Sequence, residues 1–166
     1  RNHSSAASDV YKRQEYANGL PAISNFFAFP RYVHAYDLLK KATTLSKKET
    51  AIIEDIIAES ADFLRITQEW GPMNRAMLRA EGLLYAAKML PDHPQKPTWE
   101  MMGKAILSDN IGKWGIEDAT HYTPIWLYSL MRYAIYVDEN EQVLRSPFFH
   151  YYFCLLYTSD AADEWL

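Results

Sequence analysis

Two polar stretches contain the side chains in this chain that could do chemistry, and each stands directly before an apolar stretch. Residues 70–75 open with a Trp-Gly-Pro turn and end with Asn74 and Arg75. Residues 114–122 read WGIEDATHY, and their functional side chains are Glu117, Asp118, His121 and Tyr122. Burying an amide or a guanidinium costs free energy unless the group is paired or used. These side chains therefore either have structural partners or face a substrate cleft.

Each of these residues also has a structural interpretation that the sequence leaves open. Asn74 can cap the helix that follows it, and Arg75 can pair with a neighbouring acid. His121 can be a surface histidine and Tyr122 a packing aromatic, while Glu117 and Asp118 can be a solvated pair. What favours a functional interpretation is that two such stretches stand at equivalent places, one before each apolar segment.

The elements that would position these side chains are all predicted to be helices. Apolar residues at helical spacing predict helices over 31–44, 46–67, 73–90, 98–113, 123–137 and from 146 onward. Ser46 and Glu49 form a capping box at the start of the second helix, and Thr98 is expected to cap the fourth. Thr123-Pro124 is a typical helix start. No stretch shows the clean alternation of a strand, so the chain is predicted to be all-α.

The character of the helices alternates along the chain. The second helix is amphipathic, whereas the third and the fifth are apolar on almost every side, which is typical of buried helices. Short loops favour antiparallel pairs. The alternation favours an α/α toroid or solenoid of helical hairpins over a four-helix bundle. Since both polar stretches enter inner helices at their N-termini, we expect them on the same rim of the fold.

The two ends of the chain do not read as native protein. Residues 4–14 (SSAASDVYKRQ) and 154–164 (CLLYTSDAADE) back-translate to opposite strands of one DNA sequence, which resembles a transposase adaptor used to prepare sequencing libraries. We therefore expect native protein over 15–153, between adaptor-derived segments 1–14 and 154–166. The only cysteine, Cys154, lies in the second of these segments, so disulfides and thiol chemistry are not expected within 15–153.

Charge and composition exclude several classes of partner. The formal net charge is −4 and no basic stripe is present, which argues against nucleic acid as the main partner. No apolar run approaches the roughly 20 residues of a membrane span. His93 and His121 have no neighbours at ligand spacing, so neither a metal nor another cofactor is expected. The sequence makes no prediction of oligomeric state.

A resemblance to a known family rests on two strings. WGPMNRAMLRAEGLLYAAKMLPDHP, followed by IEDATHYTPIWLYSL, resembles the helical toroid domain of bacterial polysaccharide lyases of the heparinase II/III and alginate lyase type. The resemblance covers most of 15–153 and implies an incomplete α/α toroid. One departure is Arg75, because many relatives place a histidine directly after the asparagine. In such enzymes a β-sandwich usually follows the toroid.

The resemblance implies cleavage of a uronic-acid polysaccharide by β-elimination, in the periplasm or outside the cell. A base removes the proton next to the carboxylate, and neutral or positive donors stabilise the charge that develops. Asn74 would be the stabilising group, and His121 or Tyr122 would be the base or the acid. The expected substrate-binding residues are Trp70, Arg75, Glu117, Asp118 and Trp126, although core packing is the commoner role of any single tryptophan.

Two other functions remain open on the same residues. A glycoside hydrolase on the same scaffold, similar to unsaturated glucuronyl hydrolases, would use paired carboxylates and make Glu117 and Asp118 central. A non-catalytic helical-repeat binding protein would leave both polar stretches merely solvated.

Overall fold

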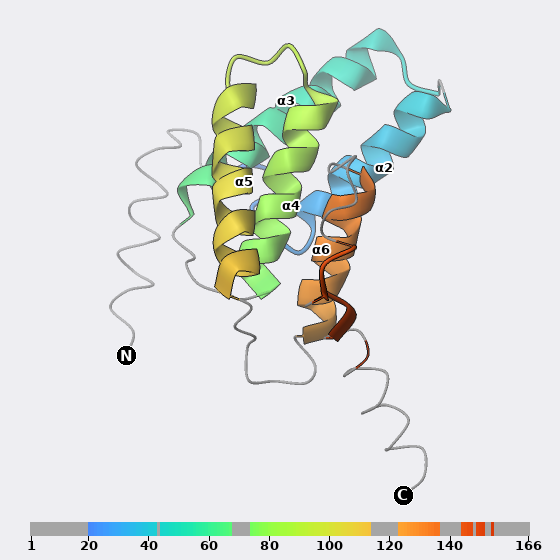
Figure 1. Ribbon diagram of the computed structural model, residues 1–166. Helices are drawn as coiled ribbons and strands as arrows, with labels where there is room; N and C mark the ends of the chain where they lie inside the picture. The colour runs from blue at the N-terminus through green and yellow to red at the C-terminus, as the bar shows by residue number, and fades with distance from the viewer. Residues whose placement is uncertain are drawn as a thin grey trace, which may run out of the picture.

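Five helices make up most of the part of the chain that the structure, a computed structural model, describes. They are α2 (Phe29–Lys41), α3 (Lys47–Ile66), α4 (Asn74–Met89), α5 (Lys96–Lys113) and α6 (Thr123–Tyr136) (Figure 1). The described residues are 20–42, 44–67, 74–113, 123–136, 144–147, 149–151 and 154, and they contain no strand. The prediction of an all-α fold is thus confirmed.

The local signals at the helix starts were right at α3 and wrong at α5. Ser46 and Glu49 form the predicted capping box: the Glu49 carboxylate accepts from the Ser46 backbone N–H at 2.8 Å, and Ser46 Oγ accepts from the Glu49 N–H at 3.3 Å. Helix α5 begins at Lys96, so Thr98 is not its cap. The Gln95 carbonyl already accepts the N–H groups of Thr98 and Trp99, both at 3.0 Å, and this starts the helical hydrogen bonding earlier.

Helix α4 is the centre of the fold and contacts the other four helices. All of its residues are buried except Arg75 and Lys88, as the sequence predicted for this segment. Two glycines allow the closest contacts. A Cβ on Gly82 would lie 2.6 Å from the Phe29 ring at the start of α2, and a Cβ on Gly103 of α5 would lie 2.7 Å from Leu84. Helices α2 and α5 therefore approach α4 more closely than a larger side chain would allow.

The hairpin of α2 and α3 covers α4 with only part of its length. The second half of α3 packs its apolar stripe inward, with Ile57, Ala61 and Leu64 buried. In the first half the predicted stripe emerges from the core, and Ile52 is exposed like Leu38 and Leu39 of α2. The loop end of the hairpin therefore extends beyond the core that α4 organises (Figure 1).

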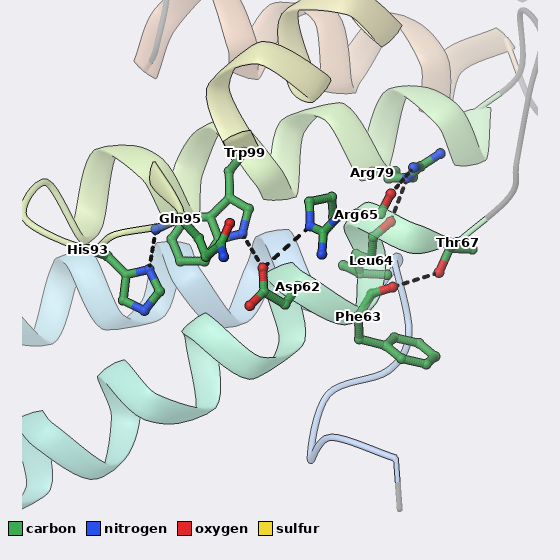
Figure 2. Close-up of polar contacts among 9 residues, drawn as sticks. All are labelled: Asp62, Phe63, Leu64, Arg65, Thr67, Arg79, His93, Gln95 and Trp99. Carbon is green, nitrogen blue, oxygen red and sulfur yellow. Dashed lines mark hydrogen bonds and ion pairs between the residues drawn. The ribbon is translucent and has the colours of Figure 1, made fainter. Parts of the chain in front are cut away.

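The end of α3 is joined to α4 and α5 by polar side chains (Figure 2). Arg79 of α4 is buried, and its guanidinium donates to the carbonyls of Leu64 at 2.6 Å and Arg65 at 2.5 Å. These carbonyls belong to the last turn of α3, where carbonyls lack the usual helical partner four residues later. The Leu64 carbonyl also accepts the Thr67 N–H at 3.3 Å. Trp99 of α5 donates its indole N–H to Asp62 at 2.8 Å. Arg79 and Trp99 thus have structural roles that fix how α3 lies on the central pair.

Candidate functional site

Helices α4 and α6 begin at the same end of the molecule. Helix α5 returns antiparallel to α4 after the short loop 90–95, so its last turns lie near the first turn of α4 (Figure 1). Trp126, in the first turn of α6, donates its indole N–H to Asn110 near the end of α5 at 3.3 Å. Since α6 therefore starts where α5 ends, Asn74 and the first residue of α6, Thr123, share one rim.

Three of the predicted site residues lie within the described part of the chain. Asn74 is the first residue of α4 and is buried. Arg75 is exposed, and its guanidinium lies 5.6 Å from the centre of the Phe26 ring. Trp126 is buried against α5, so its ring has the packing role that the sequence left open. Trp70, Glu117, Asp118, His121 and Tyr122 lie outside the described residues.

A buried charged pair that the sequence interpretation missed joins α4 to α6. Glu81 Oε1 lies 2.9 Å from Arg132 Nε, and the side chains are 2% and 13% exposed. Glu81 shares one face of α4 with Asn74, seven residues earlier, and with Tyr85, four residues later. This face looks towards α6, which contributes Ser129 and Arg132. We call Glu81, Tyr85, Tyr128, Ser129 and Arg132 the α4–α6 cluster.

Aromatic rings hold the guanidinium of this cluster. The Arg132 guanidinium carbon lies 5.3 Å from the centre of the Tyr128 ring and 5.8 Å from that of Tyr85, within the range of cation–π attraction. Arg132 Nη1 also donates to the Tyr128 hydroxyl at 2.7 Å. Tyr128 is exposed, so the cluster runs from the surface into the core. The His34 ring of α2 meets the edge of Tyr85, with 6.4 Å between ring centres.

Burial dominates the electrostatics of the α4–α6 cluster. It raises the pKa of Glu81 to about 7, although the Arg132 guanidinium, the Ser129 hydroxyl and the more distant Arg31 all oppose the rise. The pKa of His34 is lowered, first by burial and then by the positive charge of Arg132. A carboxyl group with such a pKa exchanges its proton near neutral pH, which is a property of general acids and bases as well as of strained ion pairs.

A surface cleft of about 360 Å³ lies at the opposite end of α4. Its walls come from α2, α3, the last turn of α4 and the loop to α5, and its polar lining residues are Lys40, Glu54, Asp55, Asp92 and His93. His93 stacks on Trp99 with 4.5 Å between ring centres, and its Nδ1 accepts the Gln95 N–H at 3.2 Å (Figure 2). Three carboxylates against one lysine give this cleft a predominantly acidic lining.

The sequence did contain a signal for the cluster. Arg79, Glu81 and Arg132 stand within segments otherwise apolar on almost every side, and a charged residue on a helix buried all round needs a partner. A search for those partners would have pointed to oppositely charged side chains on different apolar helices. The sequence alone does not say which charge meets which, because Glu81 and Arg132 are brought together only by packing.

Neither metal binding nor known relatives add to this description. Among the described residues, no group of three or more histidine, cysteine or acidic side chains is placed to hold a metal ion. In the same part of the chain no helix has the length and apolar character needed to cross a membrane. Comparisons with protein-family models, with curated proteins and with solved structures found no match.

Proposed function

We propose that residues 15–153 belong to the α/α toroid domain of a polysaccharide lyase that cleaves uronic-acid polymers by β-elimination. The observation that best supports the proposal is the common rim of α4 and α6. It lets Asn74, the first residue of α4, share one site with His121 and Tyr122, which directly precede the first residue of α6. The nearly complete burial of α4 and the amphipathic character of α3 also fit inner and outer helices of a toroid.

In this proposal each rim residue has a defined task. The proton next to a charged carboxylate is barely acidic, so the Asn74 amide would neutralise the charge that develops on the substrate carboxylate. Tyr122 or His121 would remove the proton and return one to the leaving oxygen. Exposed Arg75, in the first turn of α4, would attract the polyanion. Trp126 would hold the start of α6 in place instead of contacting a sugar, because its ring is buried.

The test is an assay of the protein, in its full reading frame, on separate uronic-acid polysaccharides such as alginate, polygalacturonate, hyaluronan and heparin. Each β-elimination creates a C=C bond, so product is measured by ultraviolet absorbance. Asn74→Ala should lower turnover by about 100-fold or more, the scale seen when one donor to an oxyanion is removed. Tyr122→Phe should abolish most activity with little change in melting temperature. Lys88→Met, on the exposed far end of α4, serves as the matched control.

The alternatives give different outcomes in the same assay. New reducing ends without ultraviolet absorbance would indicate a glycoside hydrolase. Binding without cleavage would indicate a helical-repeat binding protein. If Tyr122→Phe leaves the rate unchanged or unfolds the protein, Tyr122 is a packing residue and the assignment of the site is wrong.

A further inference from the structure

We propose that Glu81 and Arg132 form a proton-controlled contact between α4 and α6. When Glu81 is ionised, its carboxylate and the Arg132 guanidinium form a buried ion pair between the two helices, with 2.9 Å between Glu81 Oε1 and Arg132 Nε. When Glu81 takes up a proton from solvent, a neutral carboxyl group remains in the core, and Arg132 keeps its contacts with Tyr128 and Tyr85. This inference does not depend on the proposed lyase activity.

The first argument is the position of the carboxyl group. Glu81 is 2% exposed on the helix that contacts all the others, and the adjacent Gly82 lies directly under the Phe29 ring of α2. Water is therefore largely excluded from the carboxylate, and an ionised carboxylate in such a place needs a charge partner. Arg132 is that partner, with the two atoms 2.9 Å apart. The neutral form of Glu81 removes the need for a charge partner.

The second argument is that Arg132 is not left isolated when Glu81 becomes neutral. Its Nη1 donates to the Tyr128 hydroxyl at 2.7 Å, and its guanidinium lies against the rings of Tyr128 and Tyr85. It is also closer to solvent than Glu81, at 13% exposed against 2%. Breaking a buried pair by removing one charge is usually costly because the other charge stays buried and uncompensated. Here hydroxyl, ring faces and water remain for the guanidinium, so both states are accessible.

The pKa of Glu81 reflects a balance between burial and the groups that face the pair. Helix α6 presents Arg132 and Ser129 to Glu81, and α2 presents Arg31 at longer range, all of which favour the ionised form. Burial outweighs them, so the pKa of Glu81 lies above its usual value of 4.5, at about 7. Folding therefore favours the protonated form. The stabilising contribution is present below the unfolded pKa and is lost as the pH rises through about 7.

His34 of α2 is the other titrating neighbour, and its effect has the opposite sign. Its pKa is lowered by burial and by Arg132, so acidification through its range disfavours the folded state. A simple pH profile of stability would mix the two groups. The experiment must therefore isolate Glu81, and a comparison with Glu81→Gln does this because the glutamine keeps the shape without titrating.

The test is a nuclear magnetic resonance titration of the whole chain with labelled glutamate side-chain carboxyl carbons, together with the Arg132 Nε–H signal. We expect one glutamate signal to titrate with a midpoint of about 7, to be absent in Glu81→Gln, and to remain in the control Glu54→Gln. The Arg132 signal should shift with the same midpoint. Urea unfolding should show the unfolding constant of the unsubstituted protein rising on the order of 100-fold relative to Glu81→Gln between about pH 5 and pH 8.

The outcomes decide the proposal even if one variant does not fold. Should Glu81→Gln fail to fold, the titration of the unsubstituted protein decides alone, because a glutamate midpoint near 7 is far outside the usual range. If every glutamate titrates below about 5.5, the carboxyl group does not take up a proton near neutrality and the proposal is overturned. If a glutamate titrates near 7 but the Arg132 signal does not follow it, the two side chains do not act as one contact and the proposal also fails.

Discussion

Two carboxylates of this molecule, Glu54 on α3 and Glu81 on α4, each pair with a cation that lies against a tyrosine ring, but in different surroundings. Glu54 accepts from the Tyr36 hydroxyl at 2.5 Å and pairs with Lys40 at 3.3 Å, with side-chain exposures of 34% for Glu54 and 49% for Lys40. Glu81 pairs with an arginine held by two tyrosines, but is 2% exposed. Water therefore screens the first pair, while protein surrounds the second.

The comparison separates what a charge pair contributes from where it lies. At the surface a pair contributes little, because water solvates both charges in either state. In the core the attraction is stronger, but so is the penalty for desolvation, and the balance leaves Glu81 with a pKa of about 7. The same type of interaction, an ion pair, thus contributes little to the stability of the α2–α3 hairpin and forms a proton-sensitive contact between α4 and α6.

The largest difference between the two pairs should appear when each cation is removed. Arg132→Met leaves Glu81 buried without its partner, so we expect a loss of about 3–5 kcal/mol of unfolding free energy at alkaline pH. The loss should shrink near pH 5, where Glu81 can become neutral. Urea unfolding at both pH values measures this. An equal loss at both would show that the lost packing of Arg132, not its charge, is responsible.

A second change tests whether close packing keeps water from the buried pair. In Gly82→Ala the new Cβ would lie 2.6 Å from the Phe29 ring, so the ring, or α2 with it, must shift away from α4, at a cost of about 1–3 kcal/mol. Admitting water beside Glu81 should also bring its pKa down towards 4.5. The matched control is Gly103→Ala, which crowds the α5 side of α4. A similar loss of stability without a change in the titration of Glu81 is expected there.

A smaller effect is expected at the tyrosine of the surface pair. Tyr36→Phe keeps the buried ring and removes the hydroxyl that donates to Glu54, so we expect a loss of about 0.5–1.5 kcal/mol. Burial and the contact with Glu54 both raise the pKa of Tyr36, so no tyrosinate contributes at neutral pH. Thermal unfolding is sufficient for this measurement. A loss above that of Arg132→Met would reverse the ranking of the two regions.

The smallest effect should come from Lys40→Met. An exposed pair contributes about 0.2–1 kcal/mol, and added salt should remove most of that by screening. Unfolding in low and high salt gives the comparison. The effect of Arg132→Met should depend much less on salt, because its pair is buried. If the loss of stability in Lys40→Met is unchanged in high salt, the pair of Lys40 and Glu54 is shielded from solvent and this part of the hairpin is not exposed in solution.

Local signals were sufficient to predict the helices but not the contacts between them. The capping box at Ser46 and Glu49 placed the start of α3 correctly because cap and helix are neighbours in the sequence. The burial of nearly all of α4 was also predictable from its apolar residues. Thr98 misled because a preceding proline-containing turn already presented its carbonyl to the helix.

The candidate site was predictable only where it coincides with a helix start. Asn74 was expected at the N-terminus of an inner helix and is the first residue of α4. The ion pair between Glu81 and Arg132 was not predictable, because the two residues lie on separate helices. How far these helices are shifted along each other depends on glycine contacts and loop lengths. The hydrogen bonds of Arg79 were not predictable either. They are made to backbone carbonyls, which are present at every residue and so leave no signal in the sequence.

The bond from Arg79 to the end of α3 has a consequence for the order in which the molecule opens. The guanidinium is buried in α4 and donates to the carbonyls of Leu64 and Arg65, so α3 cannot fray from its C-terminus without breaking two hydrogen bonds of a buried charged group. The last turns of α3 and the middle of α4 should therefore exchange their amide hydrogens as one cooperative unit. The capped start of α3 should exchange sooner, although its capping box is complete, because that end projects beyond the core.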